Sequence, residues 1–124
     1  MAGRKTTPVF TENFARNLEA LRLFLGAEGG LALSRLLDRL CDDIVPTVCR
    51  FPQSGRPFLA HAPHSIETQT RLKRLRARLQ PGDDLREFIL DDYILLYVRR
   101  SNRLIFLALK HHRQLSFDLD QFWR

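Results

Sequence analysis

The stretch LREFILDDYILLYVRRSNRLIFLAL, residues 85–109, decides the fold. It holds three apolar runs, rich in the branched and aromatic residues typical of strands: Leu85–Leu90, Tyr93–Val98 and Leu104–Leu109. Asp91 and Asp92 leave room only for a tight hairpin between the first two runs. The polar residues 99–103 turn the chain again, and Asn102 can adopt a positive φ there. The runs therefore predict an antiparallel meander, with the uniformly apolar middle run as its central strand.

Upstream of this stretch, apolar residues recur at spacings of three and four, which is typical of amphipathic helices. One such face comprises Phe10, Phe14, Leu18, Leu21 and Leu25, and a second comprises Leu33, Leu36, Leu37, Leu40 and Ile44. Thr11 is a suitable N-cap for the first helix, and the glycines from Gly26 to Gly30 end it. Pro46 predicts a kink or an end just before it in the second helix. We expect a short strand over residues 8–11, followed by an αα-hairpin.

The segment after the hairpin begins with a turn-rich exit, residues 51–58, and continues as a loop. A third helix is predicted from Ser65 to about Leu79. The pattern as a whole predicts an α+β fold, in which an N-terminal helical hairpin packs on one face of a small antiparallel sheet. We expect one domain, residues 1–124, with a basic helical insertion at about 60–81.

Composition restricts the class of protein. Hydrophobic residues make up 44% and charged residues 27% of the chain, as in globular rather than disordered proteins. The net charge of +6 favours acidic partners: nucleic acid, an anionic surface or an acidic protein. Residues 1–8 lack the apolar core of a signal sequence, and no run approaches the roughly 18 apolar residues of a membrane span. We therefore expect a cytoplasmic protein without a membrane partner.

The chain has two cysteines, Cys41 and Cys49. Eight helical positions separate them by about 12 Å, which is too far for a disulfide. We interpret both as small, buried apolar residues that stay reduced. No second cluster of ligands accompanies them, and the adjacent His111 and His112 would point to opposite faces of a strand. The sequence therefore predicts neither a metal site nor a cofactor site.

Three motifs, in this order and at this spacing, carry a resemblance to a known family. They are the exit Phe51-Pro52-x-x-Gly55-Arg56-Pro57, the paired strands Leu85–Tyr93 followed by Leu96-Tyr97, and a last strand that ends in Lys110–Gln114. Over about Pro8 to Phe117 the chain resembles the RelE/ParE superfamily of toxins, the plasmid-stabilization proteins of bacterial type II toxin–antitoxin systems. The resemblance implies a toxin–antitoxin complex with a small cognate antitoxin. Antitoxins are commonly acidic in the part that wraps the toxin, which suits this basic chain.

The resemblance also implies growth inhibition through one of two targets. ParE-like members inhibit DNA gyrase and are not nucleases, whereas RelE-like members cut mRNA on the ribosome. Nucleolytic members usually place Arg directly after the middle-strand Tyr, but Ile94 follows Tyr93 here. Several carry Lys on the preceding strand, where Glu87 stands in this chain. We therefore expect a ParE-like inhibitor of gyrase, with the RelE-like endoribonuclease as the alternative, so that enzymatic activity stays open.

A nuclease needs a general base, a general acid and a cation that stabilises the phosphate. The candidate catalytic residues are His112, Arg113, Arg86 and His111. We expect them to form a basic rim beside Tyr93. Tyr93 and Tyr97 share one face of their strand, and we expect both rings to pack between the sheet and the helices.

The predicted third helix carries a run of positive charge. Its candidate partner-binding residues are Arg71, Lys73, Arg74, Arg76 and Arg78. Three interpretations stay open: a solvated polar face, contact with nucleic-acid phosphates, or contact with an acidic antitoxin. The second alternative for the whole protein is accordingly a non-toxic basic module that binds nucleic acid.

Overall fold

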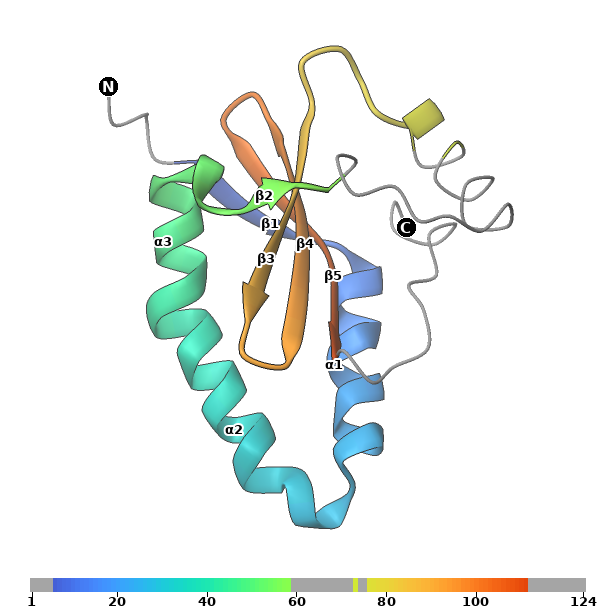
Figure 1. The fold of residues 1–124 in the computed structure, drawn as a ribbon. Coiled ribbons are helices and arrows are strands. Elements are labelled where there is room, and N and C mark those ends of the chain that lie inside the picture. The colour runs from blue at the N-terminus through green and yellow to red at the C-terminus, as the bar shows by residue number, and fades with distance from the viewer. Residues whose placement is uncertain (1–5, 59–72, 74–75, 112–124) are drawn as a thin grey trace.

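The computed structural model describes residues 6–58, 73 and 76–111 (Figure 1). The N-terminal half consists of strand β1 (Thr7–Phe10), helix α1 (Glu12–Leu25), a 3₁₀ turn (Ala27–Gly29), helix α2 (Gly30–Arg39), a π-helical turn (Leu40–Ile44), helix α3 (Val45–Arg50), a second 3₁₀ turn (Pro52–Ser54) and the short strand β2 (Arg56–Pro57). The remaining strands are β3 (Asp84–Leu90), β4 (Tyr93–Arg100) and β5 (Arg103–His111). The predicted α+β class is confirmed.

The predicted meander forms the centre of the sheet. The strand order is β1-β5-β4-β3-β2, and the pairs β3–β4 and β4–β5 are antiparallel as expected. Asp91, with φ of 51°, closes the first hairpin. In the second hairpin Ser101, with φ of 55°, takes the left-handed position that we assigned to Asn102. The carbonyl of Asn102 instead accepts a hydrogen bond from the N–H of Thr7 over 2.7 Å.

That bond adjoins a parallel pairing, β1 with β5, so the described sheet is mixed: the predicted antiparallel meander is present, and one parallel strand is added to it. The predicted first strand exists, but β1 lies parallel to β5, with Thr7 opposite Arg103 and Phe10 opposite Phe106. The four residues of β1, one of which is a proline, are too few to indicate from sequence which strand they pair with. Tertiary contacts decide the pairing, since the N–H of Thr11 donates to the carbonyl of Phe106 as α1 begins.

The helices begin and end close to the positions that the sequence indicates. The Thr11 side chain accepts a hydrogen bond from the N–H of Phe14 and caps α1, and Gly26, with φ of 71°, ends it. Pro46 does not end the second helix. The π-helical turn Leu40–Ile44, closed by a bond from the N–H of Val45 to the carbonyl of Leu40, precedes it. Pro46 then falls in the first turn of α3, directly after the π-helical turn.

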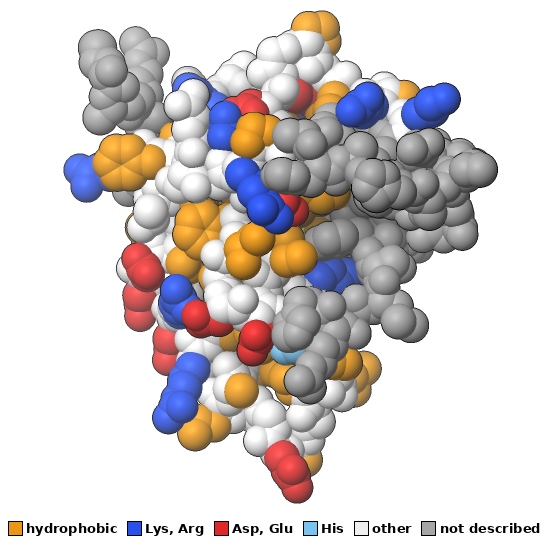
Figure 2. Space-filling model, in the orientation of Figure 1, with side chains coloured by type: hydrophobic (Ala, Val, Ile, Leu, Met, Phe, Trp, Pro, Cys, Tyr) orange, Lys and Arg blue, Asp and Glu red, His pale blue; other side chains and the backbone are white. Residues whose placement is uncertain are grey.

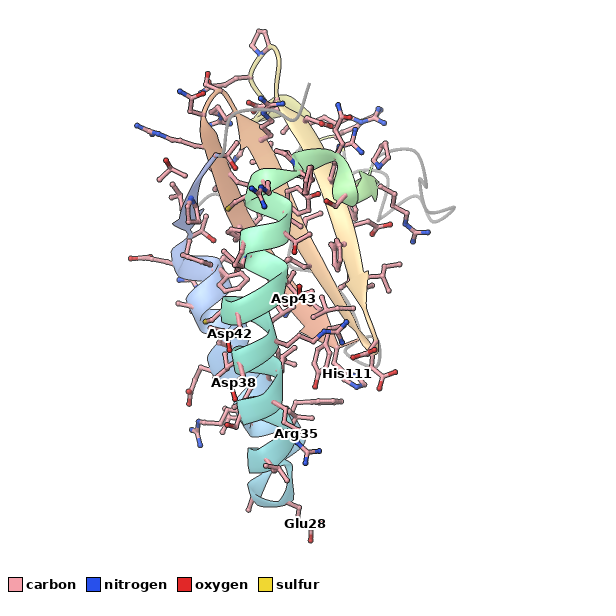
Figure 3. All side chains as sticks on the ribbon, turned by 90° about the vertical axis from the view of Figure 1, so that its left-hand side faces the viewer. Glu28, Arg35, Asp38, Asp42, Asp43 and His111 are labelled. Atoms are coloured by element: carbon pink, nitrogen blue, oxygen red, sulfur yellow. The ribbon has the colours of Figure 1, made fainter. Side chains whose placement is uncertain are left out.

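The core lies between the helices and one face of the sheet. Figure 3 looks onto α2 and α3 with the sheet behind them. The fully buried members of this layer include Leu21 of α1, Val48 of α3 and Tyr97 of β4. A second cluster covers the other face and includes Leu96, Leu107 and Ala108. Leu107 and Ala108 share that face because a β-bulge opposite Leu96 and Tyr97 adds one residue to β5.

Two further expectations differ from the structure or fall outside it. Cys49 is buried as expected, but Cys41 is exposed, so its interpretation as a core residue is wrong; no disulfide joins the two. Most of the predicted insertion at 60–81 lies outside the described residues, although Lys73, Arg76 and Ala77 are helical. Among the described helices, none is long and apolar enough to cross a membrane.

Candidate functional site

The exit from the helical hairpin is fixed to the central strand by one tyrosine. Tyr97 is fully buried, and its hydroxyl donates to the carbonyl of Pro52 over 2.7 Å and accepts from the N–H of Gly55 over 2.9 Å. Burial raises the pKa of this phenol, so the hydroxyl stays protonated and can donate. The expected packing of Tyr97 between sheet and helices is confirmed.

Arg86 lies beside the hydrogen-bonded Tyr97, because the two residues are partners in the pairing of β3 with β4. Its guanidinium donates to the carboxylate of Asp84 over 2.8 Å and to the carbonyl of Gly55 over 2.7 Å. Of the two acidic residues near it on β3, Asp84 and Glu87, Arg86 pairs with Asp84. The side chain is only 16% exposed. Binding a phosphate would require the guanidinium to be accessible from solvent, whereas here it is engaged by contacts within the chain.

Glu87 occupies the opposite face of β3, where its buried carboxylate accepts a hydrogen bond from Nε of Arg56. Arg56 belongs to β2 and pairs with Glu87 in the sheet register. The negative charge of Glu87 is therefore neutralised by a neighbouring strand. It does not lie on the surface as an isolated charge.

His111 ends β5 within an aromatic cluster at the other end of the sheet. The ring of Tyr93 meets it edge-on with centroids 5.1 Å apart, and the ring of Phe24 from α1 lies 5.3 Å away. His111 is 9% exposed. Burial, followed by the charge of Asp92, raises the pKa of Tyr93. His111 therefore packs under the helical layer, and its ring is not presented on an open strand end.

The expected basic rim does not form around Arg86 and His111. Arg86 pairs with Tyr97, whereas His111 pairs with Tyr93 on the opposite side of β4. Four residues of β4 thus separate the two levels, a distance of about 13 Å along the strand. The prediction treated the strand ends as neighbours, but in an antiparallel meander the end of β5 lies next to the start of β4 and far from Arg86.

The other candidate residues divide between the described and undescribed parts of the chain. His112 and Arg113, together with Arg71 and Arg74, lie outside the described residues. Lys73, Arg76 and Arg78 are exposed. No group of three or more potential metal ligands comes together in the part of the chain that the structure describes.

The sequence reasoning missed one buried ion pair. Asp83, whose side chain is 1% exposed, accepts hydrogen bonds of 2.7 and 3.0 Å from the guanidinium of Arg100. The Arg100 hydrogen bonds, joined by one from the N–H of Gln80, hold the pKa of Asp83 below its ordinary value. Counting away from the Asp91-Asp92 turn along both strands places residue 83 opposite residue 100. The predicted hairpin could therefore have indicated this ion pair.

Comparison with known proteins identifies the family that the fold and site resemble. A family model described as the ParE toxin of the type II toxin–antitoxin system, parDE, matches residues 9–116. No curated protein matches the chain. The matched region includes all the described strands except part of β1, and it extends through the aromatic cluster around His111.

Proposed function

The chain belongs to the family of ParE toxins of type II toxin–antitoxin systems, and on that premise we propose that it inhibits growth by binding DNA gyrase rather than by cutting RNA. Membership makes the chain the toxin of such a pair and implies a cognate antitoxin as its partner. The choice of gyrase follows from the ParE-like resemblance. The choice of contact over cleavage follows from the geometry of the candidate residues.

The observation that carries the proposal is the placement of Arg86. Its guanidinium is bonded to Asp84 and to the carbonyl of Gly55, and it lies about four residues along the sheet from His111. A ribonuclease needs its cation and its proton-transfer groups around one phosphate. Among the described residues, Arg86 and His111 do not meet this requirement. A toxin that acts by protein contact needs no such convergence.

The antitoxin part of the proposal rests on charge. A net charge of +6 attracts an acidic wrapping segment, and such attraction speeds association and weakens as salt rises. We propose that the exposed Lys73, Arg76 and Arg78 contribute to this attraction. Replacing these three residues with Gln should slow association with the antitoxin most strongly at low salt.

A supercoiling assay tests the proposed target. Purified toxin at micromolar concentration should inhibit supercoiling by gyrase, and addition of the antitoxin should restore it. A temperature-inactivated sample of the same toxin controls for nonspecific inhibition. Intact folding without any inhibition of gyrase would reject this target.

A second assay separates the nuclease alternative. Primer extension on translated messages after induction should show no new cuts in the ribosomal A site. The variant His112→Ala/Arg113→Ala extends the test to residues outside the described part. Loss of message cleavage in that variant, where the unmodified chain cuts, would establish the RelE-like activity instead. Normal growth after expression without antitoxin would favour the non-toxic nucleic-acid-binding module.

A further inference from the structure

The β4–β5 turn carries arginines that the fold does not neutralise. Its sequence is Arg99-Arg100-Ser101-Asn102-Arg103, which by itself indicates only that the chain turns. Arg100 is engaged by the carboxylate of Asp83. Neither Arg99 nor Arg103 forms an ion pair or a side-chain hydrogen bond within the part of the chain that the structure describes. Arg103 is exposed and Arg99 is half-buried, so both charges are accessible to a ligand.

The register of the turn is unfavourable for folding. Arg100 lies directly opposite Arg103 in the pairing of β4 with β5. Like charges at directly opposed positions destabilise an antiparallel pair, and Asp83 compensates the charge of Arg100 alone. Folding would therefore favour a neutral or acidic residue at position 103. A local conflict with stability of this kind is typical of residues that serve a function.

A third arginine lies at the same end of the sheet. Arg50 is the last residue of α3, and it is exposed. The N–H of Thr6 donates to the carbonyl of Cys49 over 3.0 Å, and the next residue, Thr7, lies opposite Arg103 in the pairing of β1 with β5. Two residues of the N-terminal segment thus connect Arg50 to the turn. We call the three residues Arg50, Arg99 and Arg103 the basic end.

The acidic side chains next to the basic end are neutralised. Asp83 is bonded to Arg100, and Asp84 is bonded to Arg86. Figure 2 shows other acidic side chains gathered along the left-hand edge of the molecule, where α2 and the π-helical turn lie in Figure 1. The acidic β3–β4 turn is also distant, because the eight residues of β4 separate the two turns by about 26 Å. The basic end therefore presents positive charge without nearby compensation among the described residues.

The surface beside the turn is polar. A hollow of about 470 Å³ separates the turn from the segment that precedes β3, and its lining comprises Gln80, Pro81, Gly82, Asp83, Asp84, Arg99, Arg100 and Ser101. Only Pro81 in this lining has an apolar side chain. Interfaces between proteins centre on desolvated aromatic and aliphatic side chains, whereas interfaces with nucleic acid are polar and strongly basic. The turn and its hollow match the second kind.

From these observations we propose that the basic end binds the phosphate backbone of duplex DNA. Arginine, serine and asparagine, which make up the turn, are side chains that commonly contact phosphates. The choice of DNA over RNA rests on the proposed function, because gyrase acts on DNA. The toxin then contacts the DNA that gyrase holds. The helical hairpin extends to the other end of the molecule and stays available for contacts with protein (Figure 1).

Binding of a short fluorescent DNA duplex to the purified toxin, without gyrase, tests the proposal. The variant Arg99→Gln/Arg103→Gln removes two charges from the basic end. The matched control, Arg16→Gln/Arg35→Gln, removes two charges from exposed arginines of the helical hairpin, where Figure 3 labels Arg35. The variant Arg99→Lys/Arg103→Lys keeps the charge. Melting temperatures establish that each variant is folded.

The Gln pair at the basic end should bind the duplex about tenfold more weakly at low salt. The slope of log affinity against log salt should become shallower by about 2, since each lost phosphate contact removes about 0.9 from it. Adding Arg50→Gln should weaken binding further, whereas the control pair and the Lys pair should bind like the unmodified chain. Equal losses in the two Gln pairs would show that only net charge matters and would overturn the proposal. Absence of duplex binding by the unmodified toxin at low salt would do the same.

Two further measurements separate other acidic ligands. Single-stranded RNA should bind no more tightly than the duplex; tighter binding that the Gln pair at the basic end abolishes would assign this surface to RNA and overturn the proposal. Affinity for the cognate antitoxin should not change in that variant. A tenfold loss of antitoxin affinity with DNA binding intact would assign the basic end to the antitoxin instead. Failure of the toxin to inhibit gyrase, with DNA binding lost only in the basic-end variants, would reject gyrase as the target and support the DNA site.

Discussion

The phenolic oxygen of Tyr97 accepts a hydrogen bond of 2.9 Å from the backbone N–H of Gly55, although 42 positions separate the two residues. The same oxygen donates to the carbonyl of Pro52, so one buried hydroxyl satisfies two backbone groups of the turn that leaves the helical hairpin. This relationship joins two of the sequence motifs that identify the family. It also explains why the exit needs glycine, because the hydroxyl and a β3 carbonyl lie where a Cβ of residue 55 would be.

Tyr97→Phe should lower the free energy of unfolding by about 1–3 kcal/mol, because the Pro52 carbonyl and Gly55 N–H would lose their buried partner. Tyr97→Ala should cost more, about 3–5 kcal/mol, since it also leaves a cavity in the core. Chemical denaturation measures both values. If Tyr97→Phe unfolds at the midpoint of the unmodified chain, the two hydrogen bonds contribute nothing net to stability.

Gly55→Ala should destabilise the fold by about 1–3 kcal/mol, which is the usual range for overpacking a well-filled site. A Cβ there would lie 2.6 Å from the Tyr97 hydroxyl and 2.7 Å from the carbonyl of Glu87. Gly30→Ala is the matched control, because a Cβ at that helical position meets nothing within 4 Å. Its stability should stay the same or rise by up to about 1 kcal/mol. Equal melting temperatures for the two variants would contradict the close packing around residue 55.

Local patterns predicted the elements better than their arrangement. The meander and the helical hairpin followed from apolar periodicity, because burial of one or both faces determines which residues are apolar. The parallel pairing of β1 did not follow, since residues 7–10 satisfy their hydrogen bonds with β5 only once the whole chain is folded. Strand β2 was not predicted either, because its two residues form a strand only through pairing with β3 in the folded chain. One of them, Pro57, is also a residue that strands usually avoid.

The candidate site shows where sequence reasoning fails for functional residues. Arg86 and His111 both lie on strands of one sheet, but the register places them at different levels. Residue type indicated a possible role, whereas the contacts of each side chain decide its availability. The sequence also did not predict the apolar pocket between α1 and the second arm of the hairpin, because Ala15 and Cys41 look like ordinary members of an apolar helix face until the spacing of the two arms is known.

Asp83→Asn should lower the free energy of unfolding near neutral pH by about 1–3 kcal/mol, through the loss of charge-assisted hydrogen bonds from Arg100. The pKa of Asp83 is lower in the folded protein than its ordinary value of 3.8. Its contribution is therefore fully present above that value and is lost as pH falls through the folded-state pKa. Denaturation at several pH values between about 7 and 2 should show the two proteins converging at the acid end.

Glu12→Gln is the control for that pH series. The carboxylate of Glu12 is 81% exposed and lies 3.9 Å from Arg16, so its pair contributes little. Stability of the control should stay within about 0.5 kcal/mol of the unmodified chain at neutral pH. A constant difference between Asp83→Asn and the unmodified chain down to the lowest pH would show that the charge of Asp83 does not contribute.

Cys41 and Cys49 should remain unlinked and differ sharply in reactivity. Cys41 is exposed on the π-helical turn, whereas Cys49 is 1% exposed on α3. A brief treatment of the native protein with iodoacetamide should therefore modify one thiol, and unfolding should release the second. Intact mass and peptide mapping follow both events. A disulfide in protein purified without oxidant, or faster modification of Cys49, would contradict these placements.

Arg86 provides the sharpest distinction between a structural residue and a catalytic one. Because its guanidinium binds Asp84 and the Gly55 carbonyl, Arg86→Ala should lower the free energy of unfolding by about 1–3 kcal/mol. Arg86→Lys should recover part of that loss, since Lys keeps the charge but cannot reproduce the planar fork of donors. At matched levels of folded protein, both variants should remain as toxic as the unmodified chain. The opposite result, an unchanged melting temperature with lost toxicity, would mean that Arg86 acts on the target, and it would return the ribonuclease mechanism to first place.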